Sequence, residues 1–238
     1  IDGFSRRILW LEVGHTNKNP RVIAHYFISC VQQIGGLPRV IRADAGTENV
    51  NVSGIQRFLG RNDSDSFKGE KSFMYGKSTS NQRIEAWWSF LRKTFTEWWM
   101  VFFKAMRDNG DYCDANPIHV ECLKYCFMRL LREELYRVAQ HWNLHQIRPT
   151  RNQDSPSGRP DLLYFVPESV GVTDCKVCPN HDDVEISKEL VDNEQCPSEE
   201  MFCELAEMIM EDEHLNEPQN AHEAKVLYQQ LLRHIDRL

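Results

Sequence analysis

The order of strand-type and helix-type patterns in the first hundred residues constrains the fold more than any other feature. The apolar, β-rich run Arg7–Val13 predicts a strand, and helical spacing of apolar residues predicts a helix from Pro20 to the glycine pair at Gly35. A second apolar run, Arg39–Ala43, predicts a buried strand, and a helix is predicted around Val52–Leu59. Strands and helices that alternate in this way predict an α/β layer.

Two long helical patterns follow. Ser72–Tyr75 predicts a short strand, and a helix is predicted over about 82–106, with Thr79 or Ser80 as its N-cap. Aromatic side chains occur around much of this helix, so we expect it to be largely buried or shared with a partner. A turn-rich break precedes a second long helix, predicted over about 119–145.

The C-terminal part of the chain differs in character. Residues 146–160 contain several prolines and arginines and predict an extended basic connector. Further on, the sequence indicates polar loops and then a helix near Ser198–Asp212. A last amphipathic helix is predicted over Ala221–Leu238, where Asn220 and Glu223 have the spacing of a capping box.

Charge also divides the chain. The net charge is −7, but residues 1–160 carry 23 Lys and Arg against 16 Asp and Glu, whereas residues 161–238 carry 5 against 19. A mildly basic body with an acidic tail suits a polyanionic ligand from which the tail is held away; a solvated acidic appendage explains the same charges. Uninterrupted apolar runs are too short for a membrane span, so we expect no membrane partner.

The chain contains eight cysteines. Without a secretory signal they are better interpreted as reduced thiols than as a disulfide framework. Cys175 and Cys178, with His181, have half the pattern of a zinc site, but no second Cys/His pair stands at a familiar spacing. Free thiols are the preferred interpretation, and zinc stays the alternative.

Two carboxylates stand out by their context. Asp44 follows the predicted strand in Asp44-Ala-Gly-Thr-Glu-Asn49, and Glu85 lies in the first turns of the predicted long helix, in Asn81-Gln-Arg-Ile-Glu85. A strand end and a helix can bring two carboxylates to one edge of a sheet, and carboxylate oxygens are what Mg²⁺ accepts. An Asp before a glycine turn and a Glu early in a helix also have ordinary structural uses.

These two motifs resemble the second and third acidic motifs of retroviral and retrotransposon integrase core domains, and Asp2-Gly-Phe-Ser-Arg6 matches a further motif of that family. The resemblance covers roughly residues 1–168 and is closest to integrase-core-domain proteins of animals and fungi. It implies an α/β, RNase H-like mixed sheet flanked by helices, incomplete at the N-terminus, with an α-helical C-terminal extension. The implied segments are a catalytic core over 1–110, a helical extension and connector over 111–168, and an acidic, partly helical tail over 169–238.

The family's catalytic set is Asp, Asp, Glu, and Asp44 and Glu85 take the second and third places. In the family, the first carboxylate lies within the first strand, and two further strands precede the first helix. Here only one predicted strand, Arg7–Val13, separates Asp2 from the first helix. We therefore assign Asp2 to a turn, with a catalytic role as the alternative. The first catalytic Asp is expected upstream, roughly fifteen to twenty residues before Asp2, and the fragment alone is expected to be inactive.

The helix that carries Glu85 also suggests a DNA contact, because the corresponding face touches DNA in similar integrases. Arg92 is the candidate phosphate contact, with Lys93 on its flank; a solvent-exposed arginine is the alternative. Large aromatic residues of this helix are expected in the core, not as base-stacking platforms: Trp87, Phe95 and Trp98. His141 and His145 are more simply structural than metal ligands.

The resemblance implies a polynucleotidyl transferase that processes 3′ ends and joins DNA strands, with Mg²⁺ or Mn²⁺ held by Asp44, Glu85 and the upstream Asp. We further expect DNA and further copies of the chain as partners, no small-molecule cofactor, and a nuclear location. The alternative is a domesticated DNA- or chromatin-binding protein that keeps the fold and no longer cuts. A protein-interaction module that uses the aromatic helix and the last helix is compatible with either.

Overall fold

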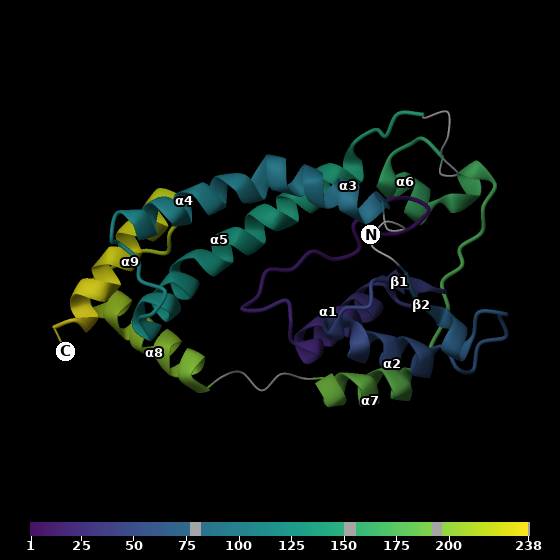
Figure 1. Cartoon of the computed structure of the whole chain (residues 1–238), viewed down its shortest axis with the longest axis horizontal. Coiled ribbons are helices and arrows are strands. Elements are labelled where there is room, and N and C mark those ends of the chain that lie inside the picture. The colour runs from purple at the N-terminus through teal and green to yellow at the C-terminus, as the bar shows by residue number, and fades with distance from the viewer. Residues whose placement is uncertain (77–81, 150–155, 192–196, 238) are drawn as a thin grey trace. The chain divides into compact units, whose positions relative to one another are not determined.

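The computed structural model describes residues 1–76, 82–149, 156–191 and 197–237, and it is mainly helical, with a small parallel sheet. The chain forms two compact units (Figure 1): the first unit contains residues 1–89 and 139–193, and the second unit contains residues 90–138 and 194–238. The expected division into functional segments at residues 110 and 168 stays a prediction.

The sheet of the first unit consists of two short parallel strands, β1 (Ile41–Ala43) and β2 (Phe73–Tyr75). Ile41 pairs with Phe73 and Ala43 pairs with Tyr75, and the N–H of Gly76 donates to the carbonyl of Ala43 at 2.8 Å. Both predicted strands are therefore confirmed, although β1 begins two residues later than the apolar run and is only partly buried, not buried as predicted. A larger, mixed sheet is not seen in the described residues and stays a prediction.

Helices α1 (Pro20–Ile34), α2 (Val50–Leu59) and α7 (His181–Val191) pack together in the first unit. The boundaries of α1 follow from local chemistry: the Asn19 side chain accepts from the N–H of Arg21 at 3.0 Å, and Gly35 ends the helix with a φ of 63°. Buried apolar residues form one core cluster here: Ala24, Phe27, Ile28, Val31, Leu37, Val52, Ile55, Leu59, Phe73, Val184 and Val191.

The strand predicted over Arg7–Val13 is wrong, since these residues form no strand in the structure. A strand needs a neighbouring strand to take up its N–H and C=O groups, and no described strand lies beside this segment. The backbone of Ile8 bonds instead to a side chain, that of Asn143.

The helix predicted over 82–106 is confirmed but is not uniform. It consists of α3 (Gln82–Leu91), a π-helical turn η4 (Arg92–Thr96) and α4 (Glu97–Asp108). The expected N-cap, Thr79 or Ser80, lies outside the described residues.

The second unit is a packing of helices. It contains the part of α3 after Ser89, η4, α4, most of α5 (Pro117–Leu144), α8 (Pro197–Asp212) and α9 (Ala221–Ile235). The predicted capping of α9 is confirmed, because the Asn220 side chain accepts from the N–H of Glu223 at 3.0 Å. Its core contains Trp99, Met106, Cys122, Cys126, Phe127, Leu130, Ala206, Ile209, Met210, Ala224, Leu227, Tyr228, Leu231 and Leu232.

Two expectations for the aromatic helix need correction. Trp87 is buried as predicted, but Trp98 is 57 % exposed and stacks on Phe102, with ring centroids 5.3 Å apart. Met100 and Val101 are more than half exposed, so α4 is not largely buried within its own unit, and the alternative that it is shared with a partner stays a prediction. Its repeat of large apolar residues exceeds what one face can place in a core.

Short elements complete the chain. The 3₁₀ turns are η1 (Thr47–Asn49), η2 (Gly69–Ser72) and η5 (Pro167–Val170), and α6 (Pro160–Phe165) is a short helix. In the predicted connector, Ile147 and Gly158 form an isolated antiparallel bridge. Among the described helices, none combines the length and the apolar character that crossing a bilayer requires.

Candidate metal and DNA-contacting site

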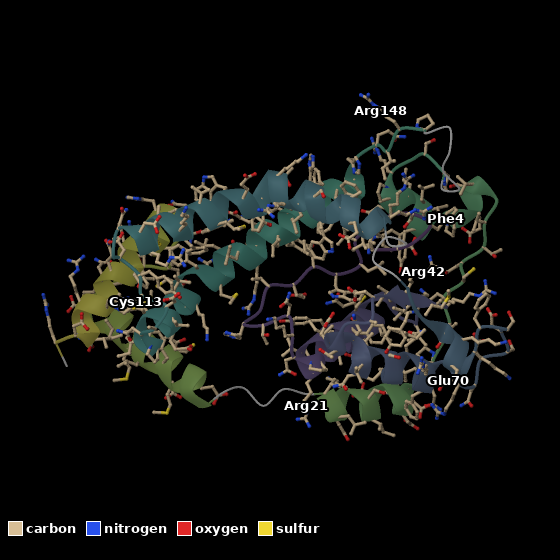
Figure 2. All side chains as sticks on the ribbon, in the orientation of Figure 1. Phe4, Arg21, Arg42, Glu70, Cys113 and Arg148 are labelled. Carbon is tan, nitrogen blue, oxygen red and sulfur yellow. The ribbon has the colours of Figure 1, made fainter. Side chains whose placement is uncertain are left out.

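The candidate site begins where the two parallel strands end. Asp44 is the first residue after β1, and Gly76 is the first residue after β2, on the way to α3. Carboxyl ends of parallel strands meet at one edge of a sheet, so both segments leave the same edge. Arg42, labelled in Figure 2, is exposed on β1 two residues before Asp44.

Asp44 is held by the turn that its own motif forms. The Asn49 amide donates from Nδ2 to Oδ1 of Asp44 at 3.1 Å, and also to Oε1 of Glu48 at 3.1 Å. The carbonyl of Gly46 accepts from the N–H of Asn49 at 3.2 Å and closes the turn. One amide therefore orients two carboxylates of the same loop.

Glu48 is the acidic residue of this loop that sequence reasoning did not single out. Its carboxylate lies over the backbone of Gly46, where a Cβ would collide with Oε1 of Glu48. A side chain at position 46 would therefore displace the Glu48 carboxylate from this arrangement. Its only signal in the sequence is its place in the same acidic motif, four residues after Asp44.

Glu85 lies on the first turn of α3 and is exposed. Two neighbours fix the helix in the first unit: Arg83 donates from its guanidinium to the carbonyl of Gly3, and Trp87 is only 2 % exposed. The Trp87 ring meets the Trp142 ring edge to face, with centroids 6.3 Å apart. The exposed carboxylate is thus carried by a helix whose other side is anchored.

The structure brings together Asp44 and Glu48 but not a larger acidic cluster. Within the described residues, no three His, Cys, Asp or Glu side chains are placed so that they could hold one metal ion. Glu85 therefore does not complete a cluster with Asp44 and Glu48 in this conformation. The donor chemistry nevertheless suits Mg²⁺, which is commonly bound through one or two protein carboxylates together with water and phosphate oxygens.

Asp2 occupies a turn, as the sequence analysis preferred. Its Oδ2 accepts from the N–H of Phe4 at 3.2 Å, and from the N–H and the hydroxyl of Ser5, each at 2.6 Å. These bonds use the carboxylate to close the turn over residues 2–6.

Arg92 and Lys93 lie in the π-helical turn η4, in the second unit, and both are exposed. The N–H of Glu97 donates to the carbonyl of Arg92, the five-residue spacing of a π-helix, and the Thr94 hydroxyl donates to the carbonyl of Phe90 at 2.9 Å. Such π turns in α-helices frequently occur at functional sites. No residue pattern in this segment indicates the π-helical turn.

Trp142 and Asn143 have a clear role that the sequence did not reveal. The Asn143 side chain accepts from the N–H of Ile8 at 2.8 Å and donates to the Ile8 carbonyl at 3.1 Å, and the Trp142 indole donates to the carbonyl of Arg6 at 2.8 Å. They hold the segment that was predicted to be a strand. The His145 ring contacts the carbonyl of Trp142, which is a structural role.

Cys175 and Cys178 are exposed and line a polar cavity of about 850 Å³ in the first unit. Asp65 lies at the same cavity, where hydrogen bonds from the Arg39 guanidinium, above all, hold its pKa at about 2. His181 is exposed at the start of α7, and the described residues give it no metal-binding cluster with the two thiols.

An α/β unit in which an acidic loop follows a parallel strand, and a second carboxylate stands on the helix after the next strand, suits a protein that acts on phosphodiesters. A comparison with known families matches residues 1–159 to the integrase core domain. This match spans well over half of the chain, so the chain belongs to the integrase core domain family, as its motifs predicted. No curated protein and no solved structure matches the chain.

Proposed function

We propose that this chain provides part of the active site of a metal-dependent polynucleotidyl transferase, which processes DNA 3′ ends and joins them to target DNA. The family membership supports DNA as the substrate. The observation that carries the proposal is the position of Asp44 at the end of β1, where Asn49 orients its carboxylate, with Glu85 on the helix that follows the parallel partner β2.

Asp44 and Glu85 are the residues that would hold Mg²⁺ or Mn²⁺. When bound, such ions activate an attacking oxygen and stabilise the leaving oxygen of a phosphodiester. The chain's own contribution is to present the carboxylates: Asn49 fixes one oxygen of Asp44 and leaves the other for a ligand. The RNase H-like mixed sheet of the family is proposed as the frame of the complete site.

Arg92 and Lys93 are proposed to neutralise DNA phosphates. Both side chains are exposed, and neither forms a salt bridge in the described part of the chain. Each phosphate contact that is lost should reduce the dependence of log K on log salt by about 0.9 for duplex DNA. We further propose that the protein acts as an oligomer in the nucleus, where its DNA targets lie.

A second function is favoured by one observation: the described residues do not assemble Asp44, Glu48 and Glu85 into one metal-binding cluster. A protein that keeps the fold, binds DNA and does not cut would use the same basic residues without the carboxylates. This alternative predicts DNA binding that is insensitive to substitution of Asp44.

The test compares Asp44→Asn and Glu85→Gln with Glu189→Gln, which changes an exposed helical glutamate of the same unit in α7. Mn²⁺ binding by calorimetry and DNA binding by fluorescence anisotropy are measured on the chain, and Mg²⁺-dependent strand joining is measured on a longer protein that also contains the upstream segment with the first Asp. We expect the first two variants to lose Mn²⁺ affinity in the chain and strand joining in the longer protein while DNA binding remains, and Glu189→Gln to behave as wild type.

The outcomes separate the two functions. If the wild-type chain binds DNA, its Mn²⁺ affinity is unchanged by Asp44→Asn, and the longer wild-type protein joins no strands, the non-cutting DNA-binding protein is correct. If the wild-type chain does not bind DNA at low salt, both functions are wrong.

A further inference from the structure

The outer side of α4 in the second unit contains a groove of about 550 Å³ that combines apolar and basic side chains. Met100 and Val101 are 52 % and 63 % exposed on its surface. The cations that line it are Arg92, Lys104 and Arg107, and none of them forms a salt bridge within the described residues. Exposed aliphatic side chains beside unpaired cations indicate a binding surface, because each is more stable when covered by a partner with matching chemistry.

The outer face of α8, in the same unit, has the opposite character. Met201 and Met208 are 69 % and 63 % exposed and lie two turns apart on one side of the helix. Exposed glutamates surround them: Glu200, Glu204, Glu207 and Glu211. The other side of α8 is buried in the core through Ala206, Ile209 and Met210.

We propose that the acidic methionine face of α8 in one copy of this chain binds in the basic groove of α4 in a second copy. The two surfaces match in chemistry, because glutamates meet the groove's cations and flexible methionines cover its apolar floor. They also match in spacing: Glu204 and Glu207 are three residues apart on α8, as Lys104 and Arg107 are on α4.

Around Lys104 and Arg107, the lining of the groove favours this occupant over DNA, and Arg92 is the one cation of the groove that is assigned to a DNA phosphate. Cations attract phosphate, but the groove is also lined by Met100, Val101 and Phe103, which gain nothing from a phosphate backbone. A helix that carries both methionine and glutamate satisfies both kinds of lining.

The two surfaces are different patches, and both are exposed in the same unit, so a single copy does not cover either one. A contact between unlike patches is head-to-tail, and it produces rings or growing chains of copies in which each copy uses both surfaces. We therefore expect association beyond the dimer as the concentration rises, and its weakening as salt shortens the range of the charges.

The experiment is sedimentation velocity of the full 238-residue chain over a range of concentrations, at low and at high salt. The groove variant combines Lys104→Glu with Arg107→Glu, and the helix variant combines Glu204→Lys with Glu207→Lys. Each should weaken association at least about tenfold. The chain with all four substitutions should associate again, because its charges are exchanged and still complementary.

Arg132→Glu is the matched control, since Arg132 is an exposed cation of α5 outside the groove. It should associate as the wild type does, and circular dichroism should show that all variants keep the helical content of the wild type. DNA affinity is measured for the groove variant in parallel.

Several results would overturn the proposal. A wild-type chain that stays monomeric at every concentration is one, and a four-substituted chain that fails to recover association is another. A groove variant that loses DNA affinity while its association is unchanged would make the groove a DNA surface instead.

Discussion

Removing the Asn143 side chain should release the segment that it holds. Asn143 is 7 % exposed, and its amide makes two bonds to the backbone of Ile8, at 2.8 Å and 3.1 Å. Asn143→Ala leaves a buried N–H and a buried C=O of Ile8 without their partner. An unsatisfied buried polar group costs about 1–3 kcal/mol, and water admitted by the smaller side chain recovers part of this. We expect the free energy of unfolding of the first unit to fall by about 2–4 kcal/mol.

Two measurements check this value. Urea denaturation followed by tryptophan fluorescence gives the change in free energy, and hydrogen exchange followed by mass spectrometry reports the Ile8 amide in a peptide from this segment. We expect exchange at Ile8 to become faster in Asn143→Ala. Leu144→Ala is the matched control, because Leu144 is the next residue and is 60 % exposed. Its effect should stay within about 0.5 kcal/mol.

The refuting result is equally clear. If Asn143→Ala changes stability no more than Leu144→Ala does, and exchange at Ile8 is unchanged, then the segment is held by its apolar contacts and the side-chain bonds contribute nothing measurable.

Two further predictions concern titratable groups. Hydrogen bonds from Arg39 hold the pKa of Asp65 at about 2, below its usual 3.8, so this ion pair stabilises the fold above a pH of about 4, and that contribution is lost as the pH falls toward about 2. A carboxyl NMR titration should show this midpoint, and a midpoint near 3.8 in the wild type would contradict it. Burial raises the pKa of the Cys30 thiol to about 11, so alkylation near neutral pH, located by mass spectrometry, should spare Cys30. The exposed thiols for comparison are Cys113, Cys175 and Cys178. Labelling of Cys30 as fast as these thiols would contradict its burial.

Most helices could be predicted because their signals are local. Pro20 at the first turn and Gly35 at the end define α1, and Asn220 with Glu223 defines the start of α9. Helix α7 was missed, since its apolar contacts, Val184 and Val191, are few and lie among charged residues. Its burial comes from packing with α1 and α2, which the local sequence does not report.

The wrong strand and the exposed aromatic residues have a common cause. Arg7–Val13 has the composition of a strand, but composition does not say whether a neighbouring strand is present. Trp98 has the composition of a core residue, yet α4 has apolar residues on more sides than its own unit covers. In both cases the sequence predicts a local preference, for a strand at Arg7–Val13 and for burial at Trp98. Whether the preference is realised depends on a neighbouring strand or on a surface that packs against the side chain.

The candidate site shows the same division between local and distant information. Asp44 could be found because the residues that orient it lie within five positions along the chain. The Glu48 carboxylate lies over Gly46, and the Asn49 amide donates to the carboxylates of both Asp44 and Glu48. Glu48 itself was missed because its role depends on the bond through Asn49, which no residue pattern specifies.

Glu85 depends on a contact that spans the chain. Its helix is anchored by Trp87, whose ring packs against Trp142, and the indole of Trp142 also donates to the carbonyl of Arg6. One side chain near the end of α5 therefore connects the position of the helix that carries Glu85 with the position of the N-terminal segment. We therefore expect a change that displaces that segment to affect the helix that carries Glu85, whereas Asp44 keeps its own local bonds. The position of Glu85 relative to Asp44 therefore also depends on contacts outside both acidic motifs, although only the motifs are visible in the sequence.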